Sequence, residues 1–334
     1  MSEFNPPLPP YPYAPPAPPY GAAMPMTIGQ ILDRVFRLLR ANVKPFLAVG
    51  LLPIGVLAVF EGVFFGALFF AGVLPHPPPH PDPAAIAWIV VPVYLLFLPV
   101  MLLMYGLYYG ASTHAALQAD EGIRVSTRDA FRDGWSRLGR YTWLLILRSL
   151  IISGPILVLV VVIGGGILLA TRGGSADSGS LALFLLIPLG ILGYIGFFVY
   201  AVLMMLRLSL AFTACVHEGI PAGLAVRRSG VLTRGAKGRI FLVALVIYAI
   251  GSAAFMAIYA IGMMAFAVGM VAGAGGMDHP SPLMIGLAVV FGLVMLGLVF
   301  VWAALQMAAY SNAFAVIYRD QCLRTGGLTP VPAQ

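Results

Sequence analysis

The chain contains six long apolar stretches arranged as three pairs, and a short arginine-bearing segment precedes each pair. These segments cover residues 27–44, 126–140 and 221–239. Each apolar stretch is roughly 28 to 34 residues long, whereas about 20 residues already cross the hydrocarbon core of a bilayer. The pattern therefore predicts an all-α, polytopic membrane protein with six transmembrane helices.

The six helices are expected to form three tandem hairpins, since only short loops separate the two members of each pair. Composition supports a membrane protein, because 60% of the residues are apolar and 9% are charged, whereas about a quarter of a soluble chain is charged. The stretches exceed the length needed to span a bilayer, so tilting or kinking must absorb the excess. The predicted spans are 46–74, 86–117, 142–170, 181–214, 240–273 and 284–316.

The basic residues lie on one side of the predicted hairpins. Sixteen of the nineteen Lys and Arg residues fall in the segments 34–44, 124–140, 227–239 and 319–324, and the loops at the opposite side hold only Arg172. Positive residues concentrate on the cytoplasmic side of plasma-membrane proteins. We therefore expect both termini and the basic segments in the cytoplasm. This placement explains the net charge of +7 without a nucleic-acid partner.

Three regions follow from this pattern: a proline-rich cytoplasmic tail at 1–26, a membrane domain at 27–318, and a C-terminal cytoplasmic tail at 319–334. The proline-rich segment cannot bury a core and is predicted to be disordered, with partial polyproline II character. Two interpretations remain open for it. The tail is either a docking ligand for a protein that recognises proline, or a solvated segment without a partner.

Each basic segment is predicted to form an amphipathic helix on the cytoplasmic membrane surface. Thr27 and Gln30 match a capping box, and Phe131 and Trp135 share one face of the second helix. Arginines opposite such apolar faces favour binding to anionic lipid. The alternative is a helical loop that only sets the topology. The basic residues concerned are Arg34, Arg37, Arg40, Arg132, Arg137, Arg140, Arg227, Arg228 and Arg234.

The order of basic segment, hairpin and acidic exit recurs three times. A serine precedes an acidic residue by nine positions in each copy, at Ser112 and Glu121, Ser209 and Glu218, and Ser311 and Asp320. The simplest interpretation is a tandem triplication, with repeats at about 27–121, 122–218 and 219–320. A single hairpin cannot shield its own polar groups, so we expect the three to pack around a common axis. The alternative is chance matching between segments rich in Ala and Leu.

Two segments resemble a known family. Residues 27–42 read Thr-Ile-Gly-Gln-Ile-Leu-Asp-Arg-Val-Phe-Arg-Leu-Leu-Arg-Ala-Asn, and residues 218–234 place an acid before an Ala…Arg-Ser…Leu-Thr-Arg run. Both are similar to the bacterial family named for the membrane domain of glycerophosphoryl diester phosphodiesterase, over about residues 27–320. The resemblance implies a multi-span domain of the bacterial inner membrane, fused in some members to a soluble phosphodiesterase barrel. Fewer than 20 residues follow the last predicted span, so we expect no barrel and no such activity here.

Residues for catalysis or metal binding do not converge in the sequence. His217 and Glu218 begin like the helix of a zinc protease, but Pro221 stands where the second histidine is required. Ser112 and His114 are two positions apart on a predicted helix and therefore point to different faces. We expect no catalytic residues, no metal, no cofactor and no enzymatic activity.

The remaining candidates are three ionisable residues inside predicted spans, Glu61, Arg148 and Arg207. Such groups are costly in hydrocarbon and face a partner or a watery cavity. The two arginines either line a pocket for an anionic headgroup or extend to the membrane interface. Glu61 is either protonated or faces a water-filled cavity.

Two functional hypotheses follow. The first is a non-catalytic membrane protein that organises lipid or docks a partner at the cytoplasmic leaflet, because the patterned polar residues lie almost entirely on that side. The second is a transporter or channel for a small, anionic or lipid substrate, with Glu61, Arg148 and Arg207 along its path. The sequence leaves the oligomeric state open.

Overall fold

The computed structural model describes residues 26–70, 83–172, 176–273 and 282–325, and every secondary-structure element in these ranges is a helix. The predictions for the proline-rich tail and for residues 326–334 fall outside the described residues. In chain order the helices are α1 (Ile28–Ala41), α2 (Val43–Phe70), α3 (Pro83–Asp120), α4 (Thr127–Ser136), α5 (Leu138–Arg172), α6 (Ala176–Arg207), α7 (Ala211–His217), α8 (Ala222–Leu232), α9 (Lys237–Gly273) and α10 (Pro282–Arg324).

Six helical stretches are long and apolar enough to cross a membrane. Five of them lie in α2, α3, α5, α9 and α10, and the sixth combines α6 with α7. The structure therefore confirms the predicted all-α fold with six long apolar helices. The last of these helices extends to Arg324, into the segment that was predicted to form a C-terminal tail.

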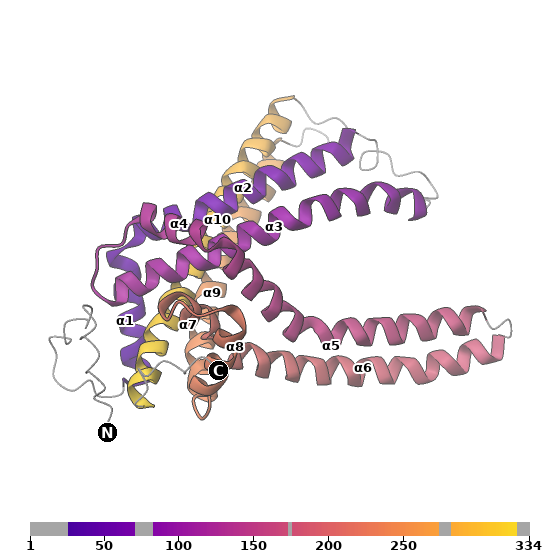
Figure 1. The fold of residues 1–334 in the computed structure, drawn as a ribbon. Coiled ribbons are helices and arrows are strands. Elements are labelled where there is room, and N and C mark those ends of the chain that lie inside the picture. Colours follow the sequence, from indigo (N-terminus) through magenta and orange to yellow (C-terminus); the bar gives the residue numbers. More distant parts are fainter. Residues whose placement is uncertain (1–25, 71–82, 173–175, 274–281, 326–334) are drawn as a thin grey trace, which may run out of the picture.

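Neighbouring long helices pack in pairs, α2 with α3, α5 with α6, and α9 with α10. The pairs meet at one end of the molecule, and α5 and α6 diverge from the other long helices towards the opposite end (Figure 1). The short helices α1, α4, α7 and α8 lie where the pairs meet. We call this region the basic end, because these short helices and the segments beside them carry most of the arginines.

The predicted span at 181–214 is interrupted. Helix α6 ends at Arg207, and α7 begins at Ala211. The hydroxyl of Ser229 donates a hydrogen bond of 2.7 Å to the carbonyl of Arg207. The hydroxyl of Thr233 lies 3.4 Å from the same carbonyl and makes its shorter bond, of 2.9 Å, to the carbonyl of Ser229. Helix breaks arise where side chains take over backbone groups of the hydrogen-bond ladder. Two side chains from the end of α8 thus satisfy a carbonyl that α6 leaves free.

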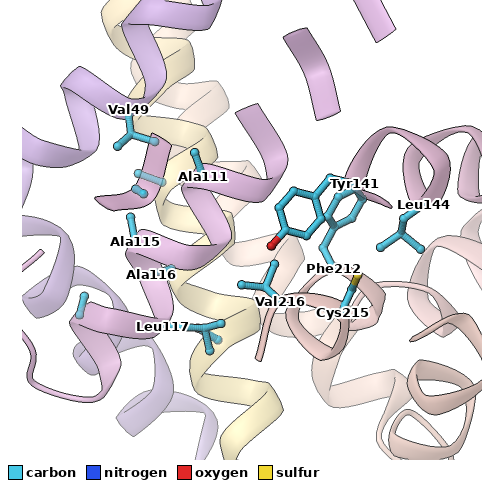
Figure 2. Close-up of a cluster of buried hydrophobic side chains, with 14 of the residues drawn as sticks. Val49, Ala111, Ala115, Ala116, Leu117, Tyr141, Leu144, Phe212, Cys215 and Val216 are labelled. Atoms are coloured by element: carbon cyan, nitrogen blue, oxygen red, sulfur yellow. The ribbon is translucent and has the colours of Figure 1, made fainter. Parts of the chain in front are cut away.

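The hydrophobic core lies at the basic end. Side chains from α3, α5 and α7 pack around Tyr141, which is fully buried (Figure 2). Alanines at Ala111 and Ala115 let α3 approach its neighbours closely (Figure 2). Farther along, α5 and α6 expose apolar side chains such as Val161 and Leu192. Lipid tails are as apolar as these side chains, so a bilayer can cover them.

Helix α1 begins with the predicted capping box. Thr27 accepts a hydrogen bond from the backbone N–H of Gln30, and the Gln30 side chain accepts one from the N–H of Thr27. Ile31 and Val35, on the apolar face of α1, are fully buried in a cluster with residues of α9 and α10. This part of the face, which was expected to meet lipid, contacts protein instead, because the ends of α9 and α10 cover it.

Candidate functional site

A cavity of about 350 Å³ lies at the basic end, next to the break between α6 and α7. Residues of α3, α5, α6, α7, α9 and α10 line it. Most of its wall is apolar, formed by the side chains Val202, Met205, Leu206, Phe212, Ile240, Phe241, Ala244, Leu245, Met307 and Phe314. A ligand in this space therefore meets hydrocarbon on most sides.

Hydroxyl groups supply most of the polar part of the wall. Thr113 lies on α3, Ser209 and Thr213 lie at the helix break and on α7, and Ser311 lies on α10. The hydroxyl of Ser209 donates a hydrogen bond of 2.8 Å to the carbonyl of Leu206 and keeps its lone pairs as acceptors. Three tyrosines complete this set, Tyr109, Tyr248 and Tyr310.

Arg148 is the one charged residue among the described residues that line the cavity. It extends from α5, within a stretch long and apolar enough to span a membrane. Among the described residues, no acidic group forms an ion pair with Arg148, and none accepts a hydrogen bond from its guanidinium. A charged group inside a membrane normally faces an opposite charge or water. The cavity thus presents a positive charge that the described protein does not neutralise.

The break between α6 and α7 positions the hydroxyls of Ser209 and Thr213 in the cavity wall. In a continuous helix through residues 208–210, the carbonyl of Arg207 would accept an intrahelical bond; here Ser229 and Thr233 occupy it. Irregular backbone at membrane depth is tolerated where protein buries it or where it lines a cavity. Ser209 and Thr213, beside this break, line the cavity.

Residues on the side of the cavity between α6 and α9 are exposed. Met205 on α6 is 50% exposed, and Tyr248 on α9 is 61% exposed. The α5–α6 pair diverges from the other long helices (Figure 1). When the six long helices lie in a bilayer, lipid can reach the cavity from this side.

Of the three ionisable residues proposed from the sequence, the structure places one in the cavity. Arg148 lines it. Glu61 is exposed on α2, and Arg207 is exposed with its side chain beside Gly230 of α8. Of the two alternatives left open for the arginines, Arg148 therefore fits the pocket, and Arg207, which is outside the cavity lining, does not.

The nine basic residues predicted to meet lipid separate into two groups. Arg34 forms an ion pair of 2.6 Å with Asp120, and Arg228 forms one of 2.9 Å with Glu218. Arg137 and Arg140 are also engaged within the protein, with Asp133 and with the carbonyl of Gly219. The exposed ones, which keep their side chains towards the surroundings, are Arg37, Arg40, Arg132, Arg227 and Arg234. This second group is the more exposed to a membrane surface, although Arg37 also pairs with the exposed Asp33.

Arg228 is held in its charged form. Burial of the side chain disfavours the charge, but the hydrogen bond to Glu218 and the negative charge of that carboxylate raise the pKa of Arg228. Glu218 also accepts a hydrogen bond from the hydroxyl of Tyr318. This network fixes α8, whose end reaches the break beside the cavity, to α10.

Two acidic residues hold further arginines at the basic end. Asp320 contacts Arg239 at 2.6 Å and Arg324 at 2.7 Å, and it accepts a hydrogen bond from the N–H of Met26. In the first helix pair the buried acid is Asp120, which lies one position before the predicted Glu121. In the sequence, the acid nine positions after the recurring serine is Asp320 in the third repeat. In the first repeat the same spacing selects Glu121, which is the neighbour of Asp120.

The hydroxyl set was only partly visible in the sequence. Ser209 and Ser311 stood out as recurring positions, whereas Thr113 and Thr213 carried no signal. Comparison with family models, with curated proteins and with solved structures gave no match for this chain. The resemblance of residues 27–320 to a known family therefore remains a prediction, and function has to be argued from the cavity itself.

Proposed function

We propose that this protein is a non-catalytic membrane protein that binds a lipid in the cavity at the basic end. The observation that carries the proposal is the guanidinium of Arg148, which has no acidic partner among the described residues and lines an otherwise apolar and hydroxyl-bearing cavity. An amphiphile with a negatively charged head and apolar chains matches both parts of this wall. Its head would neutralise Arg148, and its chains would pass between α6 and α9.

The size of the cavity supports a headgroup rather than a whole lipid. Pockets for small ligands typically measure about 300–1,000 Å³, and this one has about 350 Å³. That volume holds a phosphate, its substituent and the first atoms of the chains. The exposed side chains Met205 and Tyr248 leave room for the chains to continue into the bilayer.

The basic end is proposed to face the cytoplasm of a bacterial cell, with the protein in the inner membrane and both termini on the cytoplasmic side. The distribution of Lys and Arg supports this orientation, and the family resemblance supports the bacterial location. Exposed arginines such as Arg132 and Arg227 would then contact the anionic leaflet. Docking of a protein through the proline-rich tail stays a further proposal, argued from composition alone.

Lipid retention during purification tests the proposal. The full chain and an Arg148→Gln variant are purified in mild detergent, and bound lipid is counted by native mass spectrometry. A charge-assisted hydrogen bond contributes about 1.5–3 kcal/mol, so we expect the variant to retain roughly ten- to a hundredfold less lipid.

Arg207→Gln is the matched control, because Arg207 is an arginine of the same membrane region that lies outside the cavity lining. It should retain lipid as the unchanged chain does. Equal retention by the unchanged chain and both variants would overturn the proposal. Size-exclusion profiles establish that each variant remains folded before lipid is counted.

A transport function is the second candidate, and the helix break favours it. Interrupted helices beside a binding site occur in membrane transporters, and here the break at 208–210 adjoins the cavity. Measurable movement of a labelled lipid between leaflets of reconstituted vesicles, abolished in Arg148→Gln, would support transport over simple binding. Binding without movement would support the first proposal.

A further inference from the structure

The described residues that line the cavity carry one positive charge and no negative charge. The described lining residues include one cation, Arg148, and neither Asp nor Glu. The remaining polar groups are hydroxyls, which donate and accept hydrogen bonds but carry no charge at neutral pH. Three acids of the basic end, Asp120, Glu218 and Asp320, are outside the cavity lining and each contacts an arginine.

From this imbalance we infer that the cavity selects a lipid whose headgroup is a phosphodiester with a single net negative charge, hydroxyl substituents and no amine. The inference rests on the proposed lipid binding and goes further, because it names the class of headgroup. It excludes the zwitterionic headgroups, in which an ammonium accompanies the phosphate. It also disfavours a phosphate monoester, whose second negative charge would find no second cation in the described lining.

The phosphate is assigned to Arg148. A guanidinium presents parallel N–H donors that match two oxygens of a phosphate. One phosphodiester neutralises one arginine, so the occupied cavity carries no net charge. This balance matters because an uncompensated charge in an apolar environment is strongly unfavourable.

The amine is excluded by what an ammonium would meet. Placed near the phosphate, it would lie among hydroxyls and apolar side chains such as Phe212 and Leu245, without a carboxylate. It would also lie close to the positive guanidinium of Arg148. A substituent with hydroxyls instead finds partners in Thr113, Ser209 and Ser311, each of which can donate or accept a hydrogen bond.

The test compares headgroups on the intact protein. The full chain is placed in nanodiscs that contain equal amounts of phosphatidylglycerol and phosphatidylethanolamine with identical acyl chains. The lipid that stays bound after detergent extraction is identified by native mass spectrometry. We expect phosphatidylglycerol to be retained at least tenfold over phosphatidylethanolamine. Soluble glycerophosphoglycerol, the deacylated phosphodiester headgroup, should compete weakly when added in excess, because it lacks chains to fill the apolar wall.

Four variants separate the contribution of the Arg148 guanidinium from that of the hydroxyls. Arg148→Gln should lose the preference, and Arg148→Lys should weaken it, since lysine keeps the charge without the paired donors. The double variant Thr113→Val and Ser311→Ala keeps Arg148 and removes hydroxyls, so it should narrow the preference for phosphatidylglycerol several-fold. Arg207→Gln should keep the full preference.

The outcomes distinguish this inference from the proposed function. Equal retention of both lipids by the unchanged chain, lowered for both by Arg148→Gln, would overturn the headgroup inference and leave lipid binding in place. A preference that survives in Arg148→Gln would also overturn it, because the exposed arginines would then be its source. Retention of neither lipid would overturn both. Complete displacement of the lipid by glycerophosphoglycerol would overturn the lipid assignment and point to a soluble phosphodiester as the ligand.

Discussion

Charged side chains at the basic end differ in what neutralises them. Asp320 is almost fully buried and is neutralised by Arg239 and Arg324, whereas Arg148 lines a cavity and has no acidic partner among the described residues. Breaking a buried ion pair leaves an uncompensated charge and is strongly destabilising. The paired residues therefore stabilise the fold, and Arg148 is where the proposed ligand would bind.

Removal of the Asp320 charge should destabilise the protein. In Asp320→Asn, two arginines lose their shared carboxylate, and the acceptor for the N–H of Met26 is altered. We expect a loss of about 3–5 kcal/mol in the free energy of unfolding, the range for a broken buried pair. Thermal unfolding in detergent, followed by circular dichroism, measures this loss as a lower midpoint temperature.

Asp33→Asn is the matched control for that change. Asp33 also pairs with an arginine, Arg37, at 3.4 Å, but both side chains are more than 70% exposed. Exposed pairs of this kind contribute about 0.3–0.5 kcal/mol, so the midpoint should barely move. A similar loss in both variants would show that burial at Asp320 does not matter.

The helices themselves could largely be predicted from the sequence. Length and hydrophobicity identified the six apolar stretches, and Thr27 with Gln30 identified the start of α1, because both signals are local. The break after Arg207 could not be predicted, because its cause lies on α8, in Ser229 and Thr233. The cavity could not be predicted for the same reason. Its wall combines side chains from six helices, and no local sequence pattern indicates how those helices pack.

Close packing of α2 on α10 depends on Gly50. A Cβ added at Gly50 would come within 2.5 Å of the Cβ of Ala304 and 3.0 Å of its Cα, so the helices would have to move apart. Gly50→Ala should therefore destabilise the protein by about 1–3 kcal/mol, the usual cost of overpacking. The midpoint of thermal unfolding in detergent is again the measurement.

Gly55 supplies the control on the same helix. An added Cβ there meets nothing within 4 Å, and alanine is favoured over glycine in a helix by about 0.5–1 kcal/mol. Gly55→Ala should thus leave stability unchanged or raise it slightly. A lowered midpoint in this variant, equal to that of Gly50→Ala, would refute the packing explanation.

The whole molecule holds together mainly at the basic end. The core clusters, the buried acids and the short helices all lie there, and the α5–α6 pair diverges from the other long helices (Figure 1). The far portions of α5 and α6 expose apolar side chains that need lipid around them. The fold therefore has one end held by a hydrophobic core and ion pairs, and long helices whose exposed apolar side chains need a bilayer to cover them.

The orientation of the molecule can be tested with two single cysteines. Ser136→Cys lies at the basic end, and Asp177→Cys lies at the start of α6, at the opposite end. In spheroplasts of a bacterial host, a membrane-impermeant maleimide should label Asp177→Cys and leave Ser136→Cys unlabelled until the membrane is opened.

The unchanged chain supplies the background for this measurement. Its two cysteines, Cys215 and Cys322, are both buried, so its labelling should stay low in both conditions. Labelling of Ser136→Cys in closed spheroplasts would place the basic end outside the cytoplasm and contradict the proposed orientation.

The contact between Met26 and Asp320 also sets an order of events during synthesis. The two residues are 294 positions apart, and a ribosome completes the N-terminal part of a chain first. Helix α1 packs chiefly on α10, so its main partner is made only after the other five long helices. Arg239 and Arg324 then close on the carbonyl of Met26, at 2.6 and 3.1 Å. A nascent chain that stalls before α10 lacks the main contact surface of α1 and the carboxylate of Asp320, which distinguishes it from a chain that has made α10.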